Sequence, residues 1–267
     1  MVRSADRTAT EDYLKTIWGL TEWGVDGPVS NLAVAERLGV ATSSVSQMVR
    51  KLAQQGLVRH EPWRGLELST EGRALATSVV RRHRLSETFL LRSLGYSWDE
   101  VHAEADVLEH AMSDRMAERI DRLLGYPFRD PHGDPIPTSD GEVHRPRARP
   151  LASLAVGERG YVARITDDSA ELLRWLADHR IGLDVTIEVV DQLPFGGPLV
   201  LATGPAPGDD EGTPDEAPGQ VHLGLQAVAA LWVARVRPVA PDPALRTGAG
   251  HRPGCPYPDC DHAASRS

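Results

Sequence analysis

The residues with the clearest chemical potential lie in one short run, HAEADVLEH, at residues 102–110. Ser97 and Glu100 form the pattern of a helix-capping box just before it, and apolar residues recur at helical spacing, so the run is predicted to be helical. Imidazole nitrogen and carboxylate oxygen are common ligands of divalent cations, and such groups are costly to bury without a partner. The run therefore indicates a metal site, although a solvated acidic face with incidental histidines stays open as the alternative. Four candidate ligands fall on one stripe of the helix: His102, Asp106, Glu109 and His110.

A second predicted helix, from Thr70 to about Leu94, shifts the balance toward a metal. It carries His83 and Glu87 on one face and ends at Gly95, which suits the left-handed cap of a helix. Two antiparallel helices joined by a short turn would bring the two stripes together. One histidine–carboxylate pair is readily explained as structural, whereas two adjacent clusters are explained better by metal ions. The two clusters are His83, Glu87 and His102, and then Asp106, Glu109 and His110.

The bulk composition is that of a soluble globular protein, with room for two or three domains in 267 residues. No apolar run approaches the roughly 20 residues of a membrane span, and the polar N-terminus is not a signal peptide, so we expect a cytoplasmic protein with no membrane partner. The net charge of −9 is uneven: residues 209–216 hold five acids, whereas residues 42–64 hold one acid and four bases. Local charge decides whether a surface suits nucleic acid, so the total does not exclude DNA binding.

Three short helices are predicted near the start of the chain, over residues 8–24, 30–39 and 42–56, each ending at a glycine. Two short strands, LVRHE and LELS, follow on either side of PWRG and predict a β-hairpin. Two helices joined by a tight turn and followed by a hairpin predict a winged helix-turn-helix domain. The N-caps of the three helices are predicted to be Thr8, Ser30 and Thr42, and Thr8 is predicted to form a capping box with Glu11.

The outward face of the third helix suits double-stranded DNA, because it carries hydroxyl, amide and basic side chains and no acid. Hydroxyl and amide groups can address base edges in the major groove, while arginine and lysine address phosphates. The alternative is an ordinary three-helix domain with a solvated basic face, but the acid-free helix and the hairpin together favour DNA. The predicted DNA-binding residues are Thr42, Ser43, Ser44, Ser46, Gln47, Arg50, Lys51, Arg59 and Arg64.

The second half of the chain is predicted to turn from helix to strand. A further helix capped by Ser113 carries an apolar face that serves either as core or as a dimer seam. Residues 127–150 are rich in proline, glycine and charge and are predicted to be a linker, in which His132 is taken as incidental. Short branched segments over residues 151–240, with one helix at Ser169–His179, predict a small SH3-like barrel.

Two polar stretches are predicted to lack regular structure. Residues 204–219 form an acidic, proline-rich loop, and residues 241–267 form a disordered tail. The tail holds both cysteines of the chain, which excludes a disulfide framework in the body. Cys255, Cys260 and His262 lack neighbouring apolar residues to fold around zinc, so no metal site is predicted there.

Three segments together resemble the diphtheria toxin repressor family of metal-dependent regulators: TEDYLKTIW, VRRHRLSETFL and VHAEADVLEHAMSD. The likeness implies a mainly α fold with β structure: an N-terminal winged helix-turn-helix, a helical metal-binding and dimerisation domain, and a C-terminal SH3-like β-barrel. It also implies a homodimer that binds double-stranded operator DNA with Fe²⁺ or Mn²⁺ as corepressor. We place these domains at residues 1–72, 73–126 and 151–240, with the linker at 127–150 and the tail at 241–267.

Carried over by position, the resemblance implies two metal sites. The primary site is Asp12, Asp106, Glu109 and His110. The ancillary site is His83, Glu87 and His102, completed from the third domain by Asp168 and Glu171.

The chain departs informatively from the patterns of the family. Iron-responsive members carry methionine and cysteine where this chain has Asp12 and Asp106, whereas manganese transport regulators carry carboxylates at both positions. Oxygen donors in place of sulfur favour Mn²⁺. The small two-domain manganese regulators have another carboxylate where this chain has Lys15, so we expect a two-site layout and not their closely spaced binuclear site.

We therefore predict a Mn²⁺-dependent DNA-binding transcriptional repressor and not an enzyme, with an iron-dependent regulator of the same family as the alternative. A helical-bundle metalloenzyme belongs to another class, and di-iron enzymes place Glu-x-x-His pairs on two helices. Here Glu109 and His110 are adjacent in the sequence, and no second pair exists. A metal-independent regulator with a structural ion is the third alternative.

Overall fold

The computed structural model describes residues 2–23, 28–61, 65–166, 169–194, 197–204 and 219–237. The chain divides into two compact units. The first contains residues 1–83, 106–117 and 137–142, and the second contains residues 84–105, 118–136 and 143–267. Three helices have residues in both units: α4 (Thr70–Leu94), α5 (Val101–Ala111) and α6 (Asp114–Leu123).

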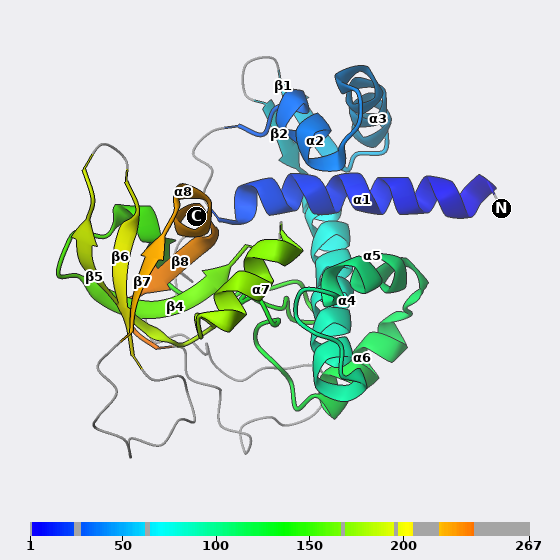
Figure 1. The fold of residues 1–267 in the computed structure, drawn as a ribbon. Coiled ribbons are helices and arrows are strands. Elements are labelled where there is room, and N and C mark those ends of the chain that lie inside the picture. Colours follow the sequence, from blue (N-terminus) through cyan, green and yellow to red (C-terminus); the bar gives the residue numbers. More distant parts are fainter. Residues whose placement is uncertain are drawn as a thin grey trace. The chain divides into compact units, whose positions relative to one another are not determined.

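The first unit has the winged helix-turn-helix that the sequence predicts (Figure 1). Helix α2 contacts both α1 and α3, and α1 also contacts β2 of the antiparallel hairpin. The elements are α1 (Val2–Glu22), α2 (Asn31–Leu38), α3 (Thr42–Gln54), β1 (Val58–Glu61) and β2 (Gly65–Leu68). Their core is formed by apolar side chains at helical spacing, which include Leu14, Ile17, Val34, Val45, Val49 and Leu52, together with Leu66 of β2.

Local capping signals explain several helix boundaries. The hydroxyl of Ser30 accepts a hydrogen bond of 3.0 Å from the backbone N–H three residues on, and Gly39 ends α2 with a φ of 64°. The hydroxyl of Ser113 does the same for α6 at 3.2 Å. Helix α4 ends before Gly95, whose φ of 76° is the left-handed conformation that glycine adopts without strain. These four predictions are confirmed.

Two predicted helix starts in the first unit are wrong. Helix α1 begins six residues before Thr8, and Glu11, the predicted partner in the capping box, instead accepts a 3.0 Å hydrogen bond from Arg7. The N-cap of α3 is Ala41, which has no side-chain cap, and Thr42 is already helical. Thr8 and Thr42 both precede a run of apolar residues at helical spacing, as an N-cap would, but both lie inside the helix.

The start of α5 is also later than predicted. The backbone N–H and the hydroxyl of Ser97 both donate to the Glu100 carboxylate, at 3.0 and 2.6 Å, within the turn that precedes the helix. Helix α5 then begins at Val101. The Ser97–Glu100 pair therefore closes a turn and does not cap the helix, while the ligand-bearing run itself is helical as predicted.

The second unit is built on a six-stranded antiparallel sheet with the strand order β3-β8-β4-β5-β6-β7 (Figure 1). Helix α7 (Ala170–Asp178) is capped by Ser169 and places Leu173 and Leu176 in the hydrophobic core. This confirms the predicted small β-rich domain and its helix near Ser169–His179, but α8 is a second helix that the sequence analysis does not predict. The remaining elements are β3 (Ala148–Pro150), η1 (Leu151–Ser153), β4 (Arg159–Ile165), β5 (Thr186–Gln192), β6 (Leu199–Thr203), β7 (Gln220–Leu223), α8 (Leu225–Ala230) and β8 (Leu231–Ala234).

Residues 128–136, at the start of the segment predicted to be a linker, form a closed turn in the second unit. Arg129 and Pro135 pair as an antiparallel bridge. Asp130, His132 and Ile136 are buried, although the local composition is that of an exposed connection. A proline-rich stretch can fold in this way because proline restricts the backbone and short polar side chains bond to nearby N–H groups.

Several sequence predictions fall outside the described residues. None of the helices that the structure describes has both the length and the apolar character that crossing a membrane requires. The predictions left outside concern Arg64, Asp168, residues 205–218, and the tail with Cys255, Cys260 and His262.

Candidate metal centre

Three residues of the first unit come together as potential metal ligands: Asp12 on α1 and Glu109 and His110 on α5. One ligand atom from each lies within 4.8 Å of the others. Nε2 of His110 is 2.9 Å from Oδ1 of Asp12 and 3.4 Å from Oε1 of Glu109. Glu109 is buried, and the other two are partly buried. The structure thus brings together three of the four residues predicted for the primary site.

The orientation of His110 is set by Glu11, which sequence reasoning treated only as a helix-start residue. Nδ1 of His110 lies 2.7 Å from Oε2 of the buried Glu11, so Nδ1 carries the hydrogen and donates it to this carboxylate. When a metal is bound, Nε2, the nitrogen that faces Asp12 and Glu109, is therefore the atom that would act as its ligand. The donor set and this second contact both fit a divalent cation. The only sequence feature that pointed to Glu11 was its position next to Asp12, a predicted ligand.

The electrostatics of the three-residue cluster also favour a cation. Burial raises the pKa of Asp12, and the Glu109 charge acts in the same direction, while His110 and Lys15 oppose it. A carboxylate that is costly to ionise in this way gains most from a nearby positive charge.

Asp106, the fourth predicted primary ligand, contacts Lys15. The Lys15 ammonium donates to Oδ1 of Asp106 at 2.8 Å and to Oε2 of Glu109 at 2.7 Å. It also lies 3.0 Å from Nδ1 of His83. Burial alone would lower the pKa of Lys15, but the charges of Glu109 and Asp106 raise it above its usual value. A protein cation therefore holds this side of the cluster together.

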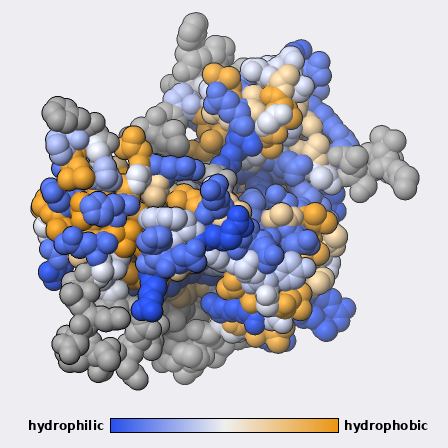
Figure 2. Space-filling view, in the orientation of Figure 1, coloured by the Kyte–Doolittle hydropathy of each residue, from blue (hydrophilic) through white to orange (hydrophobic). Residues whose placement is uncertain are grey.

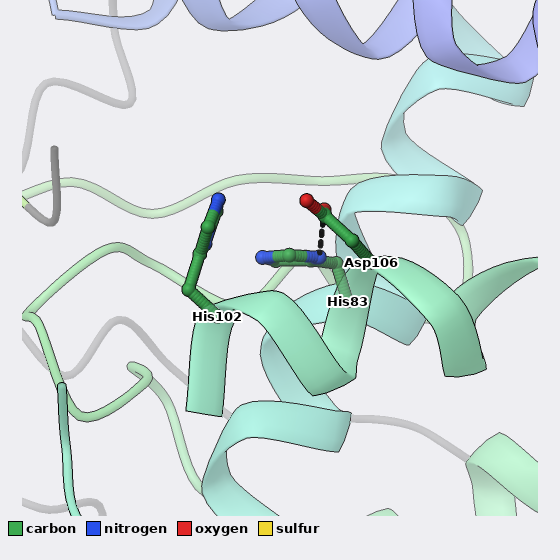
Figure 3. Close-up of side chains that lie close together, drawn as sticks. All are labelled: His83, His102 and Asp106. Atoms are coloured by element: carbon green, nitrogen blue, oxygen red, sulfur yellow. Dashed lines mark ion pairs between the residues drawn. The ribbon is translucent and has the colours of Figure 1, made fainter. Parts of the chain in front are cut away.

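His83 contacts the same two carboxylates as Lys15. Its Nδ1 is 2.5 Å from Oε2 of Glu109 and 3.3 Å from Oδ1 of Asp106. Figure 3 shows the ion pair with Asp106, and it shows His102 one helical turn before Asp106 on α5. His83, predicted as an ancillary ligand, is thus engaged with residues of the predicted primary site.

Arg82 braces the first-unit cluster and was not identified from the sequence. It is buried, and its guanidinium donates to the backbone oxygen of Glu109 at 2.7 Å and to Oε1 of Glu11 at 3.2 Å. It also contacts Ser78 at 3.0 Å. One side chain of α4 is therefore bonded to both α1 and α5. Arg82 precedes the predicted ligand His83 in the sequence, but nothing in the composition of this helix indicates that the arginine is buried.

Two of the predicted ancillary ligands meet in the second unit. Nδ1 of His102 is 3.1 Å from Oε1 of the buried Glu87. Glu171 is exposed in the first turn of α7, and none of the ligand clusters found among the described residues includes it. Asp168, the other predicted contribution from the third domain, lies outside the described residues.

The predicted recognition face of α3 is largely exposed, with two exceptions. Ser46 bonds within the domain, since its hydroxyl accepts from Asn31 Nδ2 at 3.1 Å and donates to the Thr42 carbonyl at 3.0 Å. Lys51 pairs with Asp6 of α1. Arg59 is exposed on β1, and Arg64 lies outside the described residues. The exposed members on α3 are Thr42, Ser43, Ser44, Gln47 and Arg50.

Apolar side chains are exposed on α5 and α6. The exposed fraction is 71% for Val107, 49% for Met116 and 69% for Leu123. Figure 2 shows hydrophobic residues at the surface in the region where these two helices lie. Exposed apolar side chains of this size on neighbouring helices are typical of a contact surface.

A winged helix-turn-helix whose first helix joins a carboxylate–histidine cluster is the architecture of a metal-dependent DNA-binding regulator. Family models match in the same order along the chain. Residues 7–66 match the N-terminal DNA-binding domain of iron-dependent repressors, and residues 69–138 match their metal-binding and dimerisation domain. Residues 149–206 match the FeoA domain, in the SH3-like part.

Individual relatives agree with these matches. The chain is 36% identical over 197 residues to the diphtheria toxin repressor of Corynebacterium diphtheriae, which covers 68% of this chain and 84% of that protein. It is 45% identical over 128 residues to the iron-dependent repressor IdeR of Mycobacterium tuberculosis, and the match spans 48% of this chain and about half, 55%, of that relative. The protein belongs to the diphtheria toxin repressor family.

Solved structures point to manganese as well as iron. A manganese-dependent transcriptional repressor in complex with manganese has a TM-score of 0.76 and 47% identity, covering 85% of this chain and 100% of that one. The manganese regulator SloR has a TM-score of 0.67 and 30% identity, covering 85% and 98%. The names of these relatives thus specify iron for one and manganese for two others.

Proposed function

We propose that this protein is a Mn²⁺-dependent transcriptional repressor that binds a palindromic operator as a homodimer in the cytoplasm. The observation that carries the proposal is the cluster of Asp12, Glu109 and His110, because one member lies on α1 of the DNA-binding fold and two lie on α5. The names of the relatives support a role in repression. They include both iron and manganese, so the choice between these two metals is argued from the ligands.

The donor set supports manganese over iron. Asp12 and Glu109 offer oxygen and His110 offers nitrogen, with no sulfur in the cluster. Mn²⁺ is suited by carboxylate ligands and gains little from soft ones. We propose Asp106 as the fourth ligand, released from its ion pair with Lys15. An iron-dependent regulator of the same family is the alternative, supported by the names of the mycobacterial relatives.

The residues suggest how metal would control DNA binding. A bound divalent ion would supply a positive charge shared by ligands on two helices. Asp12 lies on α1, which packs against α2 and β2, so fixing Asp12 to Glu109 and His110 restrains the domain that carries the recognition helix. Coupling of this kind is typically worth about 1–3 kcal/mol, or roughly 5–150-fold in affinity.

We propose the exposed apolar face of α5 and α6, with Val107, Met116 and Leu123, as the dimer contact. Two recognition helices related by a two-fold axis would read half-sites about 34 Å, or a multiple of it, apart. The proposed DNA-contacting residues are those of the sequence analysis, with Ser46 supporting α2 and α3. The proposed ancillary site retains Glu87 and His102 with His83, Asp168 and Glu171 as the further ligands.

The test is operator affinity at controlled free Mn²⁺ and Fe²⁺ concentrations, measured anaerobically for wild type and Asp12→Ala. We expect wild type to bind the operator about 5–150-fold more tightly with Mn²⁺ than with a chelator, and Asp12→Ala to lose most of that gain. Glu104→Ala, which alters an exposed acid of the same helix outside the cluster, is the control.

An Asp12→Ala protein that Mn²⁺ still activates fully would refute this mechanism. Activation of wild type by Fe²⁺ alone would decide for the iron-dependent alternative. A helical-bundle enzyme has lost its support, because the relatives of the chain are repressors.

A further inference from the structure

Asn31 is the only asparagine in the chain, and its side chain links the two helices of the helix-turn-helix. It is the first residue of α2, and its Nδ2 donates a hydrogen bond of 3.1 Å to the hydroxyl of Ser46 on α3. Asparagine is among the weaker helix formers, and the Ser30 hydroxyl already caps α2. The start of α2 therefore does not require an asparagine, and the contact with α3 is the feature to be explained.

The direction of this hydrogen bond follows from the Ser46 hydroxyl. Its single hydrogen is donated to the Thr42 carbonyl at 3.0 Å, so its oxygen can only accept from Asn31. The amide must therefore turn Nδ2 toward α3 and Oδ1 away from it. Two hydrogen bonds in series thus run from α2 through Ser46 to the backbone of the first turn of α3.

This orientation leaves Oδ1 of Asn31 without a donor. The atom is buried and accepts no hydrogen bond from any group in the described part of the chain. A buried acceptor in this state lowers the stability of a fold, and an apolar side chain of similar shape would avoid the cost. Stability therefore does not explain why asparagine occupies this position.

The fully buried residues of these two contacting helices are all apolar. Apolar side chains can pack in more than one arrangement at similar free energy, whereas a hydrogen bond requires one distance and one direction. A single polar pair in an apolar contact can therefore fix how two helices align, as a buried asparagine does in coiled coils, at a cost in stability. The buried residues are Val34, Ala35, Val45, Val49 and Leu52.

We propose that Asn31 is a positioning residue for operator recognition, because through Ser46 it fixes the alignment of α3 against α2. The inference rests on the proposed function, in which α3 reads the operator. Contacts to base edges require α3 to enter the groove in one orientation. Contacts to phosphates carry no sequence information directly and tolerate more variation. Loss of the Asn31–Ser46 hydrogen bond should therefore lower operator affinity more than non-specific affinity.

The experiment compares full-length wild type with Asn31→Leu, Ser46→Ala and the double variant, which replace the polar pair by apolar groups. The probes are a duplex selected by Mn²⁺-loaded wild type from a random pool and a duplex of shuffled sequence, both at saturating Mn²⁺. We expect the ratio of the two affinities to fall by about three- to tenfold in Asn31→Leu, as for the loss of one neutral hydrogen bond. The double variant should lose no more, because both substitutions remove the same bond.

Urea unfolding separates a positioning role from ordinary support of the fold. We expect the urea midpoint of Asn31→Leu to equal or exceed that of wild type, because no acceptor is then buried without a donor. Gln55→Leu is the matched control, because it makes a similar amide-to-apolar change at the end of α3. Gln55 is exposed, and its side chain makes no hydrogen bond in the described part of the chain. Its affinity ratio should equal that of wild type.

Two outcomes would overturn the inference. One is an affinity ratio in Asn31→Leu equal to that of wild type, which would exclude the Asn31–Ser46 bond from recognition. The other is a lower urea midpoint with an equal loss of affinity for both duplexes, which would make Asn31 a residue that only supports the fold. A wild type that selects no sequence from the pool with either Mn²⁺ or Fe²⁺ would refute the proposed function itself, so the wild type alone distinguishes the two failures.

Discussion

Two carboxylate–histidine clusters, one in each unit, are alike in composition and differ in how they are held. In the first unit, Asp12, Glu109 and His110 come from two helices and are braced by charged side chains, above all Lys15 and Arg82. In the second unit, the buried cluster of Glu87, Asp130 and His132 has two of its three members in one turn, which is fixed by hydrogen bonds from backbone N–H groups to Asp130. A cluster assembled across helices can report their relative position, whereas a cluster within a turn can only reinforce it. The residue types of a cluster therefore do not show whether it controls the relative position of two helices or only stabilises the fold.

The largest effect that sharpens this comparison is expected from Glu11→Gln. The Glu11 carboxylate contacts Nδ1 of His110 at 2.7 Å, and a neutral amide in its place makes the imidazole a weaker metal ligand, so Mn²⁺ binding at the first cluster should weaken by about 10–100-fold. Any Mn²⁺ held in the second unit should be unaffected, because His132 there contacts the backbone carbonyl of Trp98 and not Glu11. Mn²⁺ titration of wild type, Glu11→Gln and the control Glu104→Gln measures both. Equal weakening of all equivalents would mean that the clusters are not independent.

A smaller effect of opposite sign is expected from Lys15→Met. The ammonium of Lys15 bonds to Asp106 and Glu109 at 2.8 and 2.7 Å, so it competes with Mn²⁺ for the same oxygens. Its removal should tighten Mn²⁺ by up to about tenfold, equivalent to about 1.4 kcal/mol. The free energy of unfolding of the metal-free protein should fall by about 1–3 kcal/mol, because two carboxylates lose a charged donor.

Isothermal titration of Mn²⁺ and urea unfolding in EDTA test the two halves of this prediction. Lys51→Met, which removes the other lysine of the chain from an exposed ion pair, should change neither quantity noticeably. Weaker Mn²⁺ binding in Lys15→Met would show that the ammonium orients the ligands and does not compete with the ion.

The smallest effect concerns pH. Burial would raise the pKa of Glu109, but His83 and Lys15 bring it below its usual value of 4.5. A carboxylate with a lowered pKa stabilises the fold above its unfolded pKa, and this contribution is lost as the pH falls through the folded pKa. The unfolding free energy of the metal-free protein should therefore decline on acidification below about pH 5, and less steeply in Glu109→Gln. Urea unfolding at a series of pH values measures the slopes, and equal slopes would contradict the assignment.

Much of the fold was accessible from the sequence because its signals are local. Helical spacing of apolar residues and glycine stops placed the winged helix-turn-helix, and a Ser113 cap and a Gly95 stop placed helices beyond it. Helix starts failed at Thr8 and Thr42 because a cap residue is also tolerated inside a helix, and only the preceding backbone decides between the two.

The sequence predicted which types of residue make up the candidate site, but it did not predict which of them contact one another. Spacing along one helix was enough to identify His102, Glu109 and His110. The roles of Glu11, Lys15 and Arg82 depend on contacts between helices, which spacing does not show. His132 was missed for a different reason: proline and glycine around it indicate a linker, and the turn that buries it depends on two hydrogen bonds to Asp130. Sequence patterns report which groups are present along one element, and not which elements meet.

The hydroxyl of Ser46 is already used twice, for Asn31 and for the Thr42 carbonyl, and this bears on how an operator would evolve. The exposed side chains left near the start of α3 are mostly hydroxyls, which donate or accept equally well and so distinguish bases poorly. Gln47 is the one amide there, and an amide pairs best with adenine. Much of the information in a half-site would then rest on one A·T pair and on the shape of the duplex. If so few base pairs are read directly, an unrelated promoter would need few base changes to be bound by the repressor.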